Sequence, residues 1–175
     1  MARAMEHDFI PGLAGVPVTR SAISDLDGHR GILKLRGYAI EELAEKSTYE
    51  EAAYLVLKGE LPNARQLERF EAELAACRVV EPAILDIMKL YPKAAHPMSA
   101  LQTGVAAMGL FYPRRVDDEE LNHEACCRLV AQLPTLVAAF HNIRQGKEPV
   151  APRPELTHAA NFLYMLNGEA PEPLA

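Results

Sequence analysis

The sequence predicts an all-α protein with one small β-hairpin near its amino end, and three observations support this fold class. Residues 21–38 (SAISDLDGHRGILKLRGY) place the turn-forming run 27–31 between two short segments of roughly alternating apolar and polar residues. After residue 38 the chain reads as a series of helices with recognisable starts and stops. Two later segments, residues 98–112 and 129–140, are apolar on almost every side.

The first clearly bounded helix follows the hairpin. Thr48 and Glu51 form a T-x-x-E capping box ahead of the apolar run 52–57. Gly59 lies where a carboxyl-terminal cap is expected, because glycine adopts positive φ without a steric penalty. We therefore predict a short capped helix between Thr48 and Gly59.

Two amphipathic helices come next. The first spans residues 64–78, where Asn63 and Gln66 can cap reciprocally. The second begins at Pro82, a residue suited to a first helical turn, and stops at Pro92. The residues predicted to face inward repeat at helical spacing: Leu67, Phe70, Leu74 and Cys77 in the first helix, and Ile84, Leu85, Met88 and Tyr91 in the second.

A charged run separates the two apolar segments. Residues 114–120 predict a connecting loop in which Asp117 or Asp118 caps the next helix. Within that helix, Pro134 is expected to kink the chain or to begin the helix anew.

Residues 98–112 contain no charged side chain, so a helix here would be apolar all round. At about 1.5 Å per residue it would be roughly 22 Å long, too short to cross a bilayer, and we predict burial in protein. One domain of this size can bury one such helix, but 129–140 is a second. We therefore expect self-association through helices 98–112 and 129–140.

Composition narrows the classes of function. The 175 residues suit one soluble domain, with 49% hydrophobic and 24% charged residues. A net charge of -6 with scattered Lys and Arg argues against nucleic acid as a partner. Residues 1–16 contain no long apolar run, so neither a secretory signal nor a membrane anchor is expected and a cytoplasmic location follows. Three cysteines, two of them adjacent, do not form a disulfide framework.

Two residue patterns could in principle hold a metal ion, and we expect neither to do so. Asp25-x-Asp27-Gly28 is similar to the opening of a calcium loop, but the glycine comes too early and no glutamate follows at the required distance. A turn with a capping carboxylate is the better interpretation. His123 and Cys127 have i, i+4 spacing on a helix, but two ligands alone favour packed helix residues over a zinc site.

Several segments, in order along nearly the whole chain, resemble motifs of the citrate synthase family. They are 12–16 (GLAGV), the signature-like run 21–38, 96–99 with 101–103 (HPMS and LQT), 133–139 with 143–146 (LPTLVAA and IRQG), and 158–168 (HAANFLYMLNG), which Thr157 precedes where the family has serine.

The resemblance implies a fold. In this family a hairpin is followed by a nearly all-helical body, and residues 37–44 would begin the first helix. The helices opened by HPM and LPT belong to the large domain and pack at the subunit interface, which agrees with the apolar character of 98–112 and 129–140. Residues 1–175 would then form the N-terminal part of the large domain, without the catalytic C-terminal half.

The resemblance also implies a function for a complete family member, the condensation of acetyl-CoA with oxaloacetate to citrate in the tricarboxylic acid cycle. The two histidines and the aspartate that carry this acyltransferase reaction would lie downstream and have no counterpart here. We therefore expect no catalytic, cofactor-binding or metal-binding residue in this chain, and no activity by itself. Two alternatives remain: a 2-methylcitrate synthase fragment, which the run SDLDGHRGIL fits less well, and a short non-catalytic subunit that pairs with itself or with a full-length synthase.

Four residues have a structural and a functional interpretation, and the structural one is favoured for each. Arg144 and Lys147 complement a helix dipole, although in a complete synthase such residues could meet a CoA phosphate. His96 caps the helix that Pro97 opens, although some bacterial family members use this histidine in an allosteric nucleotide site. His158 is a partly buried structural histidine rather than a ligand contact.

Overall fold

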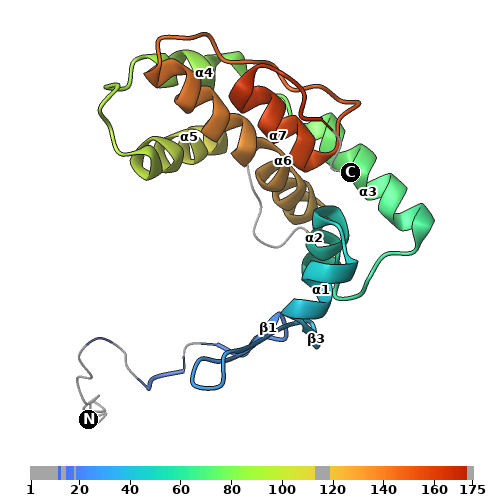
Figure 1. The fold of residues 1–175 in the computed structure, drawn as a ribbon. Helices are drawn as coiled ribbons and strands as arrows, with labels where there is room; N and C mark the ends of the chain where they lie inside the picture. Colours follow the sequence, from blue (N-terminus) through green and yellow to red (C-terminus); the bar gives the residue numbers. More distant parts are fainter. Residues whose placement is uncertain (1–11, 13–14, 18, 113–118, 173–175) are drawn as a thin grey trace.

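A computed structural model describes residues 12, 15–17, 19–112 and 119–172. It shows a helical body with a small sheet that extends from one end (Figure 1). The described elements are β1 (Ser24–Asp27), β2 (Ile32–Leu35), β3 (Tyr38–Ala39), α1 (Ile40–Lys46), α2 (Tyr49–Lys58), α3 (Ala64–Cys77), α4 (Pro82–Lys89), α5 (Pro97–Phe111), α6 (Glu119–Arg144) and α7 (His158–Asn167). The predicted fold class, all-α with a small hairpin, is confirmed.

The predicted hairpin is formed by β1 and β2. The two strands are antiparallel, and Asp27 pairs with Ile32 at the turn. Within the turn, one carboxylate oxygen of Asp27 accepts hydrogen bonds from the backbone N–H groups of His29 and Arg30, at 3.1 and 3.0 Å. Asp27 is thus a turn-capping carboxylate, as the sequence indicated.

The expectation that residues 37–44 begin the first helix is wrong at its start. Tyr38 and Ala39 form β3 and pair with Leu35 and Lys34 of β2, so α1 begins only at Ile40. The two strands join through a two-residue turn of Arg36 and Gly37, whose φ values are 50° and 92°. Two successive positive φ values match the right-handed twist of a hairpin, which is why a third strand forms here.

Helices α2, α3 and α4 follow the predicted boundaries closely. Both predicted capping boxes are present, with Thr48 and Glu51 at the start of α2 and Asn63 and Gln66 at the start of α3. Helix α2 ends at Gly59 in the left-handed conformation. The predicted inward stripes are largely confirmed, because Phe70, Leu74, Ile84 and Met88 are buried while Leu67, Cys77, Leu85 and Tyr91 are partly buried.

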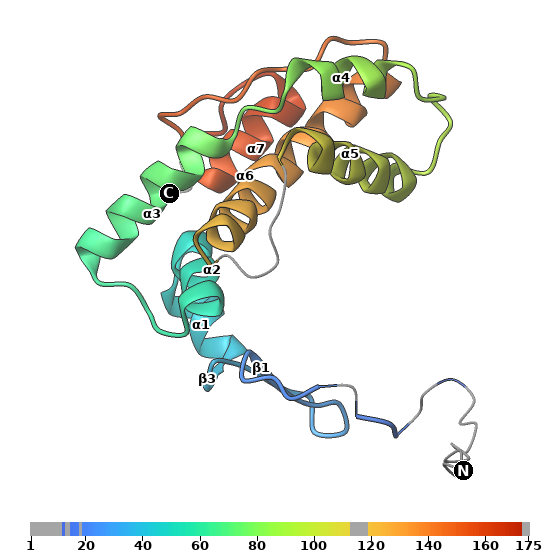
Figure 2. The ribbon, with the colours of Figure 1, turned by 180° about the vertical axis from the view of Figure 1, so that it is seen from behind.

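Helix α6 is the centre of the helical body. Figures 1 and 2 show it running through the middle of the body, and it contacts α3, α4, α5 and α7. Pro134 lies inside it, so the alternative that the helix begins anew at this proline is wrong. Side chains on both sides of the proline anchor the segment: Gln132 donates to the carbonyl of Val79 at 2.6 Å, and Thr135 donates to that of Arg78 at 3.0 Å.

The main core joins α4, α5 and α6. Its buried members are Val80, Ile84, Met88, Ala100, Met108, Leu136, Phe140 and Ile143. Gly104 of α5 allows the two helices to approach closely, because a Cβ built there would lie 3.4 Å from a methyl carbon of Leu136. Glycine at this position thus brings α5 against α6.

Among the described residues, helix α5 buries one of its apolar faces. Ala100, Gly104 and Met108 form the buried stripe. On other faces, Met98 is 62% exposed and Leu110 is 82% exposed. The apolar character of 98–112 therefore exceeds what the described residues cover.

The predicted loop 114–120 falls mostly outside the described residues, which exclude 113–118. Its capping residue, Asp117 or Asp118, lies in this range, and α6 begins at Glu119. Among the described residues, no helix combines the length and the apolarity that crossing a bilayer would require.

Candidate functional site

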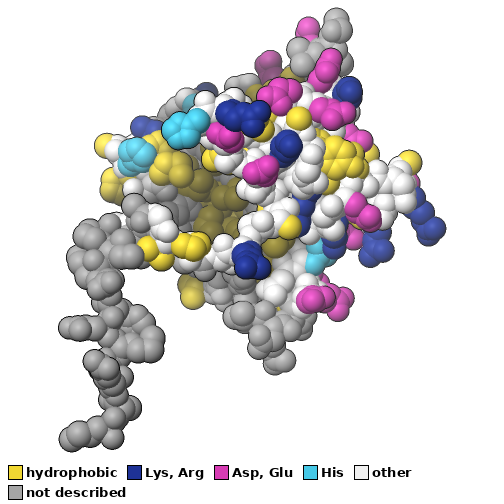
Figure 3. Space-filling view, turned by 90° about the horizontal axis from the view of Figure 1, so that it is seen from below, with side chains coloured by type: hydrophobic (Ala, Val, Ile, Leu, Met, Phe, Trp, Pro, Cys, Tyr) yellow, Lys and Arg dark blue, Asp and Glu magenta, His cyan; other side chains and the backbone are white. Residues whose placement is uncertain are grey.

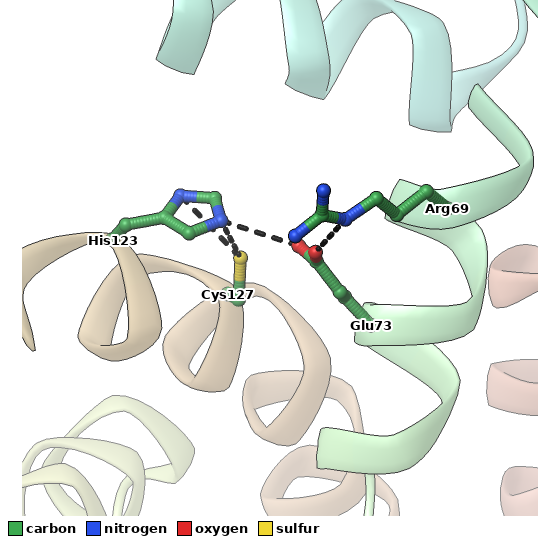
Figure 4. Close-up of polar contacts among 4 residues, drawn as sticks. All are labelled: Arg69, Glu73, His123 and Cys127. Atoms are coloured by element: carbon green, nitrogen blue, oxygen red, sulfur yellow. Dashed lines mark hydrogen bonds and ion pairs between the residues drawn. The ribbon is translucent and has the colours of Figure 1, made fainter. Parts of the chain in front are cut away.

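Three potential ligand side chains meet where α3 contacts α6 (Figure 4). Glu73 extends from α3, and His123 and Cys127 lie one turn apart on α6. The Nε2 atom of His123 lies 3.2 Å from a carboxylate oxygen of Glu73 and 3.5 Å from the sulfur of Cys127. Among the described residues, this is the group of three His, Cys, Asp or Glu ligands close enough to hold one ion, with ligand atoms within 4.8 Å of one another. We call it the Glu-His-Cys cluster.

Both helices place the cluster at the border of the core. Cys127 is 3% exposed and packs with Phe70, Leu74 and Ala131 in the second core cluster. His123 is partly exposed, with 28% of its side-chain surface accessible. The cluster thus has a buried sulfur and a solvent-facing imidazole.

The cysteine of the cluster is not an activated nucleophile. Burial, together with the negative charge of Glu73, raises the pKa of Cys127 to about 11, so the group is a neutral thiol near neutral pH. A catalytic Cys–His pair needs the opposite shift, because the thiolate is the reactive form. Covalent catalysis by Cys127 is therefore not supported.

Sequence reasoning found two members of this cluster and missed Glu73. In the sequence Glu73 is typical of an ordinary ion pair on a helix surface, because Arg69 precedes it by four residues. In the structure the Nε atom of Arg69 lies 3.0 Å from one carboxylate oxygen of Glu73. Nothing in the local pattern indicates that α3 lies beside α6, fifty positions further along the chain. Only the tertiary fold brings the third ligand to the other two.

His96 takes the structural role predicted for it. Its Nδ1 atom accepts a hydrogen bond from the backbone N–H of Met98 at 3.2 Å, which satisfies a free donor in the first turn of α5. Pro97 occupies the first helical position, where its missing N–H has no cost.

Arg144 lies in the last turn of α6, where a positive charge complements the helix dipole. Its Nε donates to the carbonyl of Lys93 at 3.0 Å, and its guanidinium lies 5.7 Å from the ring centre of Phe140. Lys147 is exposed beyond the helix end. Arg144 thus links the end of α6 to the loop before α5.

His158 is a buried residue at the start of α7. It is 7% exposed, and its ring stacks on Tyr49 with centroids 4.8 Å apart. The backbone N–H of His158 donates to a carboxylate oxygen of Glu50 at 3.0 Å. Burial lowers the pKa of His158, the charge of Arg78 lowers it further, and Glu50 partly opposes these effects. The histidine is therefore a neutral structural group, in line with the interpretation from sequence.

This lowered pKa predicts a loss of stability in acid. The ordinary pKa of a histidine side chain is about 6.5. As the pH falls below this value, His158 takes up a proton more readily in the unfolded state than in the folded state, so the free energy of unfolding decreases. We expect His158→Gln to have a flatter profile of urea midpoint against pH than the parent chain between about pH 7.5 and pH 5. His141→Gln, at an exposed position, is the control and should keep the parent's slope. Equal slopes for His158→Gln and the parent would contradict this assignment.

Comparison with known proteins places this fold in a family. One long central helix, the helices packed around it and a short preceding sheet define the chain as an all-α protein. A family model described as "Citrate synthase, C-terminal domain" matches residues 12–175. The chain belongs to the citrate synthase family.

Individual relatives support the same assignment. Citrate synthases from Synechocystis sp. and Acidithiobacillus ferridurans are 49% and 47% identical over 95% and 96% of this chain, which spans 42% and 45% of their lengths. The crystal structure of citrate synthase from Pyrobaculum aerophilum superposes with a TM-score of 0.84 at 42% identity, covering 94% of this chain and 44% of that one. A "Citrate/2-methylcitrate synthase" of Bacillus subtilis is 36% identical over 97% of this chain and 46% of its own length.

The chain therefore spans less than half the length of these relatives. The matching family model is described as a C-terminal domain, whereas the order of the motifs predicts that residues 1–175 form the N-terminal part of the large domain. That placement stays a prediction.

Proposed function

We propose that this chain is the helical scaffold part of a citrate synthase whose complete form condenses acetyl-CoA with oxaloacetate to citrate. The observation that carries the proposal is 49% identity to a citrate synthase along almost the whole chain, together with coverage of only 42% of that relative. The chain's own contribution would be α5, α6 and the helices packed around them. A cytoplasmic location belongs to the same proposal.

The chain alone is expected to be inactive. The two histidines and the aspartate of the family's reaction have no counterpart in its motifs, and His96 and His158 have structural roles. His96 caps α5 and His158 is buried in the stack on Tyr49. We therefore assign no catalytic residue and no bound cofactor to this chain, and acetyl-CoA would be a substrate of the complete enzyme.

An assay of thiol release tests this proposal. With acetyl-CoA and oxaloacetate, we expect no turnover above the uncatalysed rate from this chain, and measurable turnover from a complete synthase that contains it. Circular dichroism of the same sample should show a folded helical chain, which ensures that inactivity does not reflect unfolding. Turnover by the chain alone would overturn our view of where the reactive groups lie.

Two other functions remain as alternatives. The complete protein could accept propionyl-CoA and make 2-methylcitrate, an activity that the name of the Bacillus subtilis relative includes. Comparing the turnover of the two acyl-CoA substrates by the complete enzyme decides this point. A short non-catalytic subunit is the second alternative, and the mass of the protein isolated from its native source separates it from part of a larger synthase.

The scaffold role includes self-association through helices 98–112 and 129–140. An apolar groove supports this proposal: it is lined by Met98 and Leu101 of α5, Val137 and Phe140 of α6, and Phe162 and Leu166 of α7. Figure 3 shows hydrophobic side chains gathered around a hollow on the face seen from below. An apolar surface of this kind favours contact with another protein surface.

A further inference from the structure

We propose that Glu73, His123 and Cys127 bind a divalent metal ion of the zinc class, which cross-links α3 to α6. The site is separate from the proposed condensation reaction, and its role would be structural. Its donor set is one carboxylate oxygen, one imidazole nitrogen and one sulfur. Zinc accepts all three donor types, whereas magnesium and calcium prefer oxygen alone.

Two of the three separations within the cluster match those of ligands around a shared tetrahedral ion. With bonds of about 2.0 Å to oxygen, 2.0–2.1 Å to nitrogen and 2.3 Å to sulfur, tetrahedral geometry places nitrogen roughly 3.3 Å from oxygen and 3.6 Å from sulfur. The observed separations from Nε2 of His123 are 3.2 Å to Glu73 and 3.5 Å to Cys127. The three ligand atoms lie within 4.8 Å of one another, whereas a shared tetrahedral ion needs roughly 3.5 Å between oxygen and sulfur, so side-chain rotation must bring these two atoms closer.

The sulfur lies over the imidazole ring, because Sγ of Cys127 is 3.5 Å from Nε2 and 3.9 Å from Nδ1 of His123. The contact of Nε2 with Glu73, at 3.2 Å, is an ordinary hydrogen bond when Nε2 carries the proton. Metal binding would replace that proton by the ion, and the His123 ring would have to turn so that its Nε2 lone pair points between the oxygen and the sulfur.

The surrounding residues hold the ligands in position. Arg69 binds one oxygen of Glu73 at 3.0 Å and leaves the other oxygen directed at His123 (Figure 4). His123 and Cys127 are one turn apart on a continuous helix, so their spacing is fixed by α6 itself. A partner that orients a ligating carboxylate in this way is typical of metal sites in proteins.

All three members of the cluster line a cavity of about 350 Å³. Cys77, Glu120 and Glu124 line it too but lie outside the group of three ligands, so the fourth ligand would be water or one of these side chains after it turns toward the ion. The guanidinium of Arg128, which lines it too, lies 3.8 Å from the ring centre of Tyr112 and is engaged there. On binding, the thiol proton of Cys127 passes to solvent and the sulfur binds the ion as thiolate.

Cobalt(II) is the probe that tests this site, because its colour reports the donor atoms. Adding CoCl2 to the reduced full chain should give a thiolate-to-cobalt charge-transfer band at one equivalent, and ZnCl2 should remove it by displacement. Zinc should also raise the midpoint of thermal unfolding, and EDTA should reverse the increase. Absence of the band at several equivalents of cobalt would overturn the proposal.

Variants identify the ligands. Glu73→Gln and His123→Gln should each weaken cobalt binding by about a hundredfold or more, since even outer-sphere partners contribute about 10- to 100-fold. Cys127→Ser should abolish the charge-transfer band. Cys126→Ser is the matched control, because Cys126 is adjacent but outside the cluster, and it should keep the parent's spectrum.

Folding and alternative ligands are distinguished in the same experiment. Each variant is compared in EDTA by circular dichroism, so that loss of the band is counted only for a folded chain. Cys77→Ser shows whether the fourth ligand is a thiolate: a weaker band would add Cys77 to the site, and an unchanged band would leave that position to oxygen. A band that survives Cys127→Ser or depends on Cys126 would contradict the site proposed.

Discussion

Arg78→Met is expected to lower the free energy of unfolding by about 3 kcal/mol or more, because the buried guanidinium holds two carbonyl groups. Arg78 is 4% exposed, and its Nη1 donates to the carbonyls of Arg153 and Leu156 at 2.9 and 2.7 Å. A hydrogen bond from a charged donor contributes about 1.5–3 kcal/mol. Methionine fills a similar volume but leaves both carbonyls without this donor.

Chemical denaturation by urea measures this effect. Arg65→Met, at an exposed position of α3, is the matched control and should change stability by no more than about 0.5 kcal/mol. If the two variants have the same unfolding midpoint, Arg78 does not hold the segment before α7 in place. The carbonyl of Arg78 itself should keep its bond from Thr135, so α3 and α6 should stay connected in the variant.

Met98→Glu is expected to weaken self-association by roughly a hundredfold, if the apolar groove is the contact surface of the proposed oligomer. Met98 is 62% exposed and lines the groove, so its replacement should leave the core intact. A carboxylate buried unpaired at an interface costs about 3 kcal/mol or more, and every 1.4 kcal/mol corresponds to tenfold in affinity. Light scattering over a dilution series measures the shift in mass.

Leu90→Glu provides the control for this prediction. Leu90 is 83% exposed but lies at the end of α4, outside the two helices proposed to associate. The variant should associate as the parent chain does. A parent chain that is monomeric and binds no hydrophobic dye would contradict the oligomer itself, since its apolar groove would then be neither covered nor accessible.

Local signals in the sequence predicted most of the helices. Capping boxes and first-turn prolines act within a few residues of where they stand, so the starts of α2, α3, α4 and α5 could be located without knowledge of the fold. The third strand was missed because it depends on Arg36 adopting a positive φ, which is uncommon for a residue with a side chain.

Pro134 shows a second limit of prediction from local pattern. Proline removes one hydrogen bond from a helix, and that local cost predicts a kink or a new helix. In the structure the surrounding segment is held by tertiary bonds from Gln132 and Thr135 and by burial of Leu136. The two hydrogen bonds come from residues more than fifty positions away, and together with this burial they let one helix continue through the proline.

The sequence indicated only two of the three members of the Glu-His-Cys cluster, because the third depends on the tertiary fold. The spacing of His123 and Cys127 places two ligands on one face of a helix, whatever the rest of the fold. Glu73 joins them only because α3 lies against α6. With two potential ligands, the interpretation as ordinary packed helix residues was favoured. The fold adds Glu73 as a third, and this is the reason for proposing a metal site.

Arg36 attaches the small sheet to the helical body. The sheet carries little buried surface of its own, since Leu26 of β1 is 72% exposed and Ile23, which precedes β1, is 42% exposed. The guanidinium of Arg36 nevertheless reaches α2 and donates to the carbonyl of Val56 from two nitrogens, at 3.2 and 2.9 Å. The residue that carries backbone strain in the β2–β3 turn is thus also the one that fastens this turn to the helices. Without that side chain, we expect the hairpin to unfold as a separate cooperative unit. Its amide hydrogens would then exchange with solvent sooner than those of the helical body.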